Sequence, residues 1–395
     1  MERELQLKKR RMKASSKATE GNQYYDYNLL VVVIFLTCFG LIMLYSSSAF
    51  AGQRIHGDDL HFFARQALFA GFGVVAMVVV SKIHYHIYAV FAREIFVISL
   101  LLLFVVWTPL GVEANGARRW IGLPAGLTFQ PAELVKVSII IIMAYDLCRQ
   151  GKRTFSLIGA GKLLSLGLIA SGLVLFLTSN LSTAIIIMGI SLVQFFVVHP
   201  KTKPFLIAMG LSIGAAAIAV WYIVNQMYLS AAESGFRLWR IVAWRNPEEF
   251  ASGRSFQLVQ SLYAIGSGGF WGRGLGSSTQ KLGVIPEVQN DMILAIVAEE
   301  LGIFGVIVLL VLFAMLLYRL MFIAQNAPDL FSSLIVIGIF AHIALQVTLN
   351  VAVVTNLIPT TGVSLPFVSA GGTALAILLA ELGIALNISR KIKIN

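Results

Sequence analysis

Charged residues are scarce in this sequence. Only 12% of its 395 residues are Asp, Glu, Lys or Arg, whereas 58% are hydrophobic, and it contains just two cysteines. So little charge leaves too little polar surface for a soluble fold. Cys38 and Cys148 both lie inside apolar runs and far apart, so no disulfide framework is implied. None of the histidines has a second ligand at the spacing of a metal site.

Apolar runs that suit a bilayer crossing recur along the whole chain. We predict an all-α polytopic membrane protein with both termini in the cytoplasm. A basic tail occupies residues 1–27, a ten-helix domain 28–388 and a short tail 389–395. The predicted spans are residues 28–46, 62–80, 94–110, 131–148, 163–178, 184–198, 205–225, 292–318, 332–354 and 371–388.

The loop between the seventh and eighth spans, residues 226–290, is far too long to be a turn, and loops of this length usually carry function. Two stretches within it, residues 241–244 and 256–265, are typical of short amphipathic helices. We therefore expect a large extracytoplasmic loop with helical structure of its own.

The excess of 30 Lys and Arg over 19 Asp and Glu follows the predicted topology. With the N-terminus inside, the cytoplasmic segments hold most of the basic residues, as the positive-inside rule requires. The basic tail is then explained by topology and anionic lipid; the alternative, a nucleic-acid arm, is disfavoured. The basic residues of the outer face are nearly all arginine, which grips phosphate and carboxylate through a planar fork. They indicate an anionic ligand or pairing with nearby acids.

Asp291 is the most informative residue, because it stands where a polar stretch meets a long apolar run. A carboxylate at the mouth of a membrane helix is costly to desolvate and marks a functional site by default. Glu287 lies one turn earlier. The residues on the helix face beneath Asp291 are all small: Ala295, Ala298, Gly302 and Gly305. Either another helix packs closely on this face or it lines a cavity.

Glu133 and Lys136 form a second charged pair at the start of the fourth span. Three residues apart, they share a helix face and can form an ion pair. An unpaired lysine at that depth would be expensive. The pair either fixes helix register or lines the same cavity as Asp291. Glu381, inside the tenth span, has no obvious partner in the sequence, and no role is assigned to it.

Two glycine-rich runs are candidate anion sites. In residues 266–281, glycines would let backbone N–H groups approach a phosphate, with charge from Arg273 and Lys281. The second run opens the last span, where hydroxyls and unpaired N–H groups would meet at a helix N-terminus. It comprises Ser369, Gly371, Gly372 and Thr373.

Four ordered motifs resemble the SEDS family (shape, elongation, division and sporulation), to which FtsW, RodA and SpoVE belong. The resemblance covers essentially the whole chain, and Gln280-Lys281 is closest to the FtsW/SpoVE branch. The motifs are Asn115-Gly116-Ala117-Arg118-Arg119-Trp120-Ile121 with residues 129–136, Gly272-Arg273-Gly274-Leu275-Gly276, residues 286–302, and Pro359-Thr360-Thr361-Gly362 followed by residues 365–369.

The resemblance implies a peptidoglycan glycosyltransferase of the bacterial cytoplasmic membrane. It would polymerise lipid II at the outer face in cell division, beside a class B penicillin-binding protein and other divisome membrane proteins. Asp291 matches the family's essential aspartate, and Glu133 with Lys136 its buried charge pair. A divalent cation, Mg²⁺ or Mn²⁺, is implied by the family alone. Candidate substrate-binding residues are Arg273, Lys281, Gln280, Arg118, Arg119, Glu287, Ser369, Gly371, Gly372 and Thr373.

The sequence departs from the family pattern at three places. Asn180 removes an acid from a usual Gln-Pro-Asp-Leu-Gly-Thr motif, Ala370 replaces a tyrosine, and Asn290 replaces a threonine. Two rival functions stay open, a lipid II flippase and a non-catalytic divisome scaffold. The arginine-rich outer face and the position of Asp291 at the outer mouth argue against both.

Overall fold

The structure is a computed structural model that describes residues 25–392 with internal gaps. The gaps are 115–116, 125–126, 201–202, 204–206, 208–209, 212–213, 216–217, 223–235, 250–254 and 281–288. Most of the predicted basic tail, much of the seventh span, and both Lys281 and Glu287 lie outside the described residues, so the predictions for them stay predictions.

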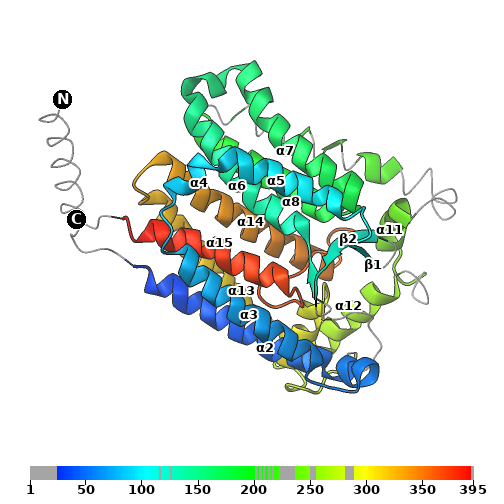
Figure 1. Ribbon diagram of the computed structural model, residues 1–395. Helices are drawn as coiled ribbons and strands as arrows, with labels where there is room; N and C mark the ends of the chain where they lie inside the picture. Colours follow the sequence, from blue (N-terminus) through cyan, green and yellow to red (C-terminus); the bar gives the residue numbers. More distant parts are fainter. Residues whose placement is uncertain are drawn as a thin grey trace, which may run out of the picture.

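Helices cover nine of the ten predicted spans, and the seventh is described only in part (Figure 1). Within the described residues, six helices are long and apolar enough to cross a membrane. The mostly helical membrane fold is confirmed, whereas the count of ten spans and their sidedness stay predictions. The helices are α2 (Tyr27–His56), α3 (His61–Val80), α4 (His86–Val90), α5 (Ala92–Val105), α6 (Pro131–Gln150), α7 (Leu157–Thr178), α8 (Leu181–Val198), α11 (Phe236–Arg245), α12 (Phe256–Gly268), α13 (Ile293–Gln325), α14 (Leu330–Val354) and α15 (Thr373–Ser389), with a 3₁₀ turn, η2 (Gly151–Phe155), after α6.

The loop after α5 forms a small antiparallel sheet that the all-α prediction missed. Strand β1 (Gly111–Ala114) pairs with β2 (Ala117–Gly122), which pairs with β3 (Thr128–Phe129). The sequence carried a signal for it: an Asn-Gly pair between two runs with β-branched and aromatic residues is a strong hairpin signature. The two helices predicted inside the long outer loop are confirmed as α11 and α12.

The helices run side by side as a bundle, with the sheet, α11 and α12 gathered at one end and α4 at the other (Figure 1). At the α4 end, Asp26 caps the start of α2 and accepts two hydrogen bonds at 3.1 Å and one at 2.7 Å from Arg319 of α13. Its backbone N–H donates to Ser389 at the end of α15 (3.4 Å). The first and last described helices therefore begin and end on the same side.

Asp329 caps α14 at this same end and binds the helix that follows α3. The Tyr85 hydroxyl donates to its carboxylate (2.5 Å), and Ser332 completes a capping box. Burial acts to raise the pKa of Asp329, but the hydrogen bonds from Tyr85 and Ser332 outweigh it, so the pKa lies below its ordinary value. Burial, reinforced by Asp329, raises the pKa of Tyr85.

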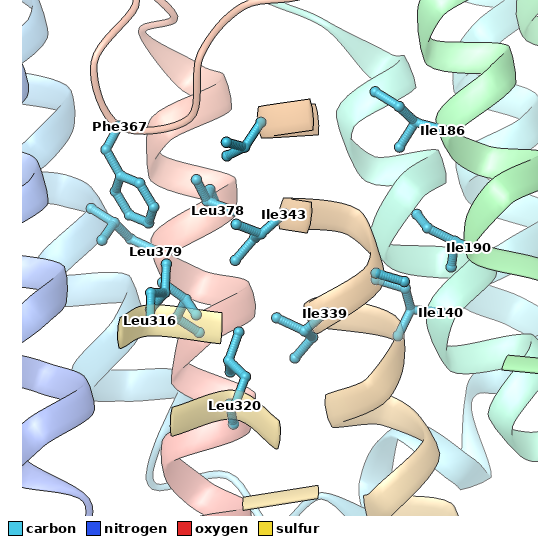
Figure 2. Close-up of a cluster of buried hydrophobic side chains, with 14 of the residues drawn as sticks. Ile140, Ile186, Ile190, Leu316, Leu320, Ile339, Ile343, Phe367, Leu378 and Leu379 are labelled. Carbon is cyan, nitrogen blue, oxygen red and sulfur yellow. The ribbon is translucent and has the colours of Figure 1, made fainter. Parts of the chain in front are cut away.

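The centre of the bundle is a packed apolar core (Figure 2). Leucines and isoleucines from α6, α8, α13, α14 and α15 meet there, and Phe367 reaches in from the loop before α15. The core is buried by packing between helices, because lipid supplies no hydrophobic drive for helix association.

Helix α13 is broken at Gly302, whose φ of 69° and ψ of −171° suit glycine alone. A Cβ there would lie 2.3 Å from the carbonyl oxygen of Phe270. The half before the break packs along α12, where Gly268 and Gly272 approach the backbone of Ala298 and Glu300. Two of the small residues predicted beneath Asp291, Ala298 and Gly302, therefore serve close packing, the first of the two interpretations of that face.

We expect Gly302→Ala to destabilise the protein by roughly 2 kcal/mol or more, from backbone strain plus the clash. The measurement is thermal unfolding in detergent. Gly71→Ala is the matched control, because Gly71 lies within α3 and a Cβ there meets nothing within 4 Å. Equal melting temperatures for the two variants would contradict a required glycine at the break.

Candidate active site

Asp291 is half-buried just before α13 and is held from two sides. Gln257, at the start of α12, donates its side-chain N–H to Asp291 Oδ1 (3.0 Å). Asn350, near the end of α14, donates to the Asp291 carbonyl oxygen (3.0 Å). These contacts fix both the backbone and the carboxylate at the end of the bundle that carries the sheet, α11 and α12. Asp291 was identified from the sequence, but its partners Gln257 and Asn350 were not.

The predicted Glu133–Lys136 ion pair is present, with Lys136 Nζ 2.8 Å from Glu133 Oε2. The lysine side chain is only 2% exposed, so the pair is nearly dry. Both residues line a mainly polar cavity with about 320 Å³ of empty space. The other residues that line it are Gln130, Asn180, Ser182, Thr183, Ile186, Gln346, Gly362, Val363 and Ser364.

Asp291 is not among the residues that line this cavity, but it lies directly beside it. A Cβ on Gly362 would be 3.7 Å from Asp291 Oδ2, and Gly362 itself lines the cavity. Thr361 is fixed in turn by the hydroxyl of Ser182, which donates to its carbonyl oxygen. Gly362, in the loop between α14 and α15, thus lies between the Asp291 carboxylate and the cavity that the charge pair lines. The interpretation that Asp291 and the charge pair line the same cavity is therefore corrected: Asp291 lies beside the cavity and does not line it.

A chain of buried polar side chains continues from Lys136 into the bundle. Lys136 Nζ donates to Gln346 Oε1 (3.2 Å), which also lies 3.0 Å from His342 Nε2. His342 Nδ1 lies 2.9 Å from Glu381 Oε2. Glu381, which had no partner in the sequence, is therefore bound to His342. An intramembrane histidine and an intramembrane acid were each visible in the sequence, but nothing in one sequence indicates that they pair.

The N–H groups of Gly371 and Gly372, before the start of α15, already have a partner within the protein, contrary to the predicted anion site. Gln66 of α3 accepts from the backbone N–H groups of Gly371 (3.3 Å) and Gly372 (2.9 Å) and donates to the carbonyl oxygen of Ser369 (3.3 Å). The Ser369 hydroxyl accepts from Leu365 N–H (2.7 Å) and Thr373 donates to the carbonyl oxygen of Thr128. A glutamine side chain thus occupies the donors that were assigned to an anion.

The glycine run after α12 is likewise used for packing. Arg273 and Gly274 donate their backbone N–H groups to the carbonyl oxygens of Glu299 and Glu300. The Arg273 guanidinium lies 3.5 Å from the fully buried Glu299 carboxylate. Glu299 lies six residues into α13, roughly 9 Å along its axis from Ile293, whereas Asp291 precedes the helix. Arg273 therefore contacts Glu299, and its role in substrate binding stays a prediction. Gln280, near the end of this run, follows Thr279 in the sequence. Thr279 donates its backbone N–H and its hydroxyl to Glu299 Oε1, both at 3.1 Å.

Arg118 and Arg119 also serve contacts within the protein. Arg118 pairs with Glu113 across the β1–β2 hairpin (3.3 Å), and Arg119 donates to the carbonyl oxygens of Thr178 and Ser179 at the end of α7. A cation suits the negative end of a helix. The described arginine that reaches the loop beside Asp291 is Arg240 of α11, which donates to the Thr360 carbonyl oxygen (3.3 Å).

The described residues hold no cluster of three His, Cys, Asp or Glu side chains that fits a metal ion. Asp291 already accepts an amide N–H from Gln257. A magnesium ion bound through one carboxylate would need phosphate oxygens and waters for its other ligands. The side chains described here do not form a metal site of their own, so no chemical step is assigned to a metal.

The profile of the FtsW/RodA/SpoVE family, described as cell cycle protein, matches residues 27–394. The chain belongs to the SEDS family. It is 39% identical over 367 residues to stage V sporulation protein E of Bacillus subtilis, covering 92% of this chain and 97% of that one. It is 37% identical over 372 residues, 94% of each chain, to the probable peptidoglycan glycosyltransferase FtsW of Trichlorobacter lovleyi.

Solved structures agree with this SEDS assignment. A chain from a peptidoglycan synthase complex, described as coordinating polymerization and crosslinking, superposes with a TM-score of 0.76 at 26% identity, covering 93% of this chain and 98% of that one. The rod shape determining protein RodA of Thermus thermophilus gives a TM-score of 0.66 at 26% identity, covering 94% and 98%.

One departure from the SEDS pattern has a structural explanation. Asn180 caps α8 by accepting from the Thr183 backbone N–H (3.1 Å), as an aspartate would. The change therefore preserves the helix start and removes one negative charge from the cavity wall. Nothing in the structure explains the change at Asn290. Ala370 donates its backbone N–H to the Gln289 carbonyl oxygen, a contact that does not depend on its side chain.

Proposed function

We propose that this protein is a peptidoglycan glycosyltransferase that polymerises lipid II at the outer face of the bacterial cytoplasmic membrane. The observation that carries the proposal is the half-buried Asp291 carboxylate, fixed by Gln257 and Asn350 one glycine away from a polar cavity. The names of its FtsW relatives and the likeness to a peptidoglycan synthase complex support the same reaction class.

In the proposed reaction, Asp291 is the general base. Its carboxylate removes the proton from the acceptor sugar hydroxyl as that oxygen attacks the anomeric carbon of the lipid-linked donor. The bond from that carbon to the phosphate oxygen breaks, and undecaprenyl diphosphate leaves with the bonding electron pair. Assistance of this kind is worth about 10²–10⁴-fold.

The leaving diphosphate needs positive charge, because stabilisation of developing charge is often the largest catalytic contribution. Lys136 is a buried cation that lines the cavity together with Gly362 of the loop beside Asp291, and Glu133 holds it in place. Arg240, which donates to Thr360 of that loop, is the second candidate. Arg273, Arg118 and Arg119 are not assigned this role, because they bind acids or carbonyl groups elsewhere.

A lipid II flippase is less well supported. Translocation needs a polar path across the bundle, whereas isoleucine and leucine side chains pack together at its centre (Figure 2). Assembly with a class B penicillin-binding protein is part of the proposal, since a relative of similar fold belongs to a complex that couples polymerization to crosslinking. A role in division and a divisome scaffold function rest on family resemblance alone.

The test is a gel assay of glycan products from purified protein and lipid II, with and without a class B penicillin-binding protein. We expect glycan polymers in at least the second condition. A parallel assay in sealed vesicles follows fluorescent lipid II across the bilayer. Translocation without any polymer would favour the flippase, and neither activity would favour the scaffold.

A further inference from the structure

The pair formed by His342 and Glu381 is buried in the bundle and has no role in the reaction proposed above. Their side chains are 3% and 1% exposed. His342 contacts Glu381 with one ring nitrogen and Gln346 with the other. Gln346 in turn contacts Lys136. The pair is therefore connected to the cavity lysine through a single amide oxygen.

Hydrogen-bond chemistry fixes which atoms carry protons along this chain. The Gln346 side-chain nitrogen lies 3.0 Å from the Ser364 carbonyl oxygen, which can only accept, so the Gln346 nitrogen faces Ser364 and its oxygen faces Lys136 and His342. An amide oxygen also only accepts. His342 must therefore carry a hydrogen on Nε2.

The contact on the other ring nitrogen then needs one more proton. A neutral imidazole with its hydrogen on Nε2 has a bare Nδ1, and a carboxylate has no hydrogen to give it. Either His342 is doubly protonated beside a charged Glu381, or a neutral His342 accepts from a protonated Glu381. In both cases one proton lies between Nδ1 and the carboxyl group.

We propose that this shared proton controls the support that Gln346 gives to Lys136, so that His342 and Glu381 are positioning residues for the proposed polymerisation. Loss of the proton leaves a charged Glu381 that draws the remaining hydrogen to Nδ1. His342 Nε2 then presents a lone pair to Gln346 Oε1. Two acceptors repel, so Gln346 withdraws and Lys136 keeps only Glu133.

Flipping the Gln346 amide would not relieve this repulsion. Its nitrogen would then face the Lys136 ammonium, which also only donates, and its oxygen would face the Ser364 carbonyl oxygen. The arrangement is consequently sensitive to a single proton. The site is favoured at lower pH and weakened at higher pH.

The elements packed against α14 and α15 carry further titratable groups, of which Glu133 and Lys136 belong to this cluster. Helix α8 contributes none. Those on the remaining neighbours are Glu133, Lys136, Tyr145, Asp146, Cys148 and Arg149 of α6, Glu299, Glu300, Tyr318 and Arg319 of α13, His61 and Arg65 of α3, and Tyr263 of α12. Glu133 and Lys136 are the members that line the cavity with Gln346.

The deciding variant is Glu381→Gln, which has nearly the same shape but cannot lose a proton. Its amide nitrogen can donate to His342 Nδ1 at every pH, which keeps the hydrogen on Nε2. We expect the ratio of variant to wild-type polymerisation to increase as the pH is raised, by about tenfold once the wild type has lost the shared proton, the value of a hydrogen bond to a charged group. Titration of other groups affects both proteins and cancels in the ratio.

Glu94→Gln is the matched control, an exposed acid at the start of α5 for which the ratio should stay flat. A flat ratio for Glu381→Gln as well would overturn the proposal. A purely structural role would lower the activity of that variant equally at all pH values.

Nitrogen-15 NMR of labelled histidine rings reports which ring nitrogen of His342 is protonated, so this measurement does not depend on enzyme activity. His342→Gln identifies the signal by its disappearance. We expect Nε2 of His342 to be protonated in the wild type while the shared proton is present, and to stay protonated as the pH is raised only in Glu381→Gln. A bare Nε2 at neutral pH would sink the proposal. Absence of polymer from the wild type at every pH would instead count against the proposed function. The NMR spectra would then still show whether His342 and Glu381 share a proton.

Discussion

Asp291→Asn is expected to lower glycan polymerisation by purified protein about 10²–10⁴-fold, the usual contribution of a general base. The asparagine has nearly the same size, and its side-chain oxygen can still accept from Gln257. The Asn350 contact is to the backbone, so it survives as well. The loss should therefore appear in turnover, with little change in thermal stability or in lipid II binding.

Asp58→Asn is the control for this experiment. Asp58 is an exposed acid after α2 that accepts from the Leu60 backbone N–H (3.0 Å), a contact that asparagine can also make. Its variant should polymerise like the wild type. Undiminished polymer from Asp291→Asn would remove the general base from the mechanism, and a large drop in melting temperature would show that the residue acts through folding.

Much of the architecture could be predicted from the sequence, because a membrane helix is recognised from its own continuous run of apolar residues. Apolar length located nine described helices, and helical spacing predicted the Glu133–Lys136 contact. Asp291 stood out since a carboxylate beside a long apolar run is rare. Each of these inferences depends on neighbours within a few residues along the chain.

Contacts between distant segments could not be found in that way. Gln346 is 210 residues from Lys136, and Gln66 is more than 300 residues from the loop that it holds. Spacing says nothing about such pairs. The outer arginines could not be assigned from the sequence for the same reason. Their number indicated a bound anionic ligand, yet Arg119 and Arg273 bind groups of the protein itself.

Breaking the Glu133–Lys136 pair should have the second large effect. Glu133→Gln leaves the Lys136 ammonium almost wholly buried with amide oxygens to accept from it but no negative charge beside it. Removing one member of a buried ion pair costs roughly 3–5 kcal/mol, because the other charge stays in a dry site. We expect a clear fall in melting temperature in detergent, together with loss of polymerisation.

The double variant Glu133→Gln/Lys136→Met separates stability from function. With both charges gone, no buried charge is uncompensated, and replacing a buried pair by neutral groups is often close to neutral. We therefore expect the double variant to recover most of the melting temperature of the wild type while making no polymer, since the cavity has lost its cation. Recovery of polymerisation along with stability would show that the pair only fixes helix register. A double variant as unstable as Glu133→Gln would show that the cost lies in packing rather than in an unpaired charge.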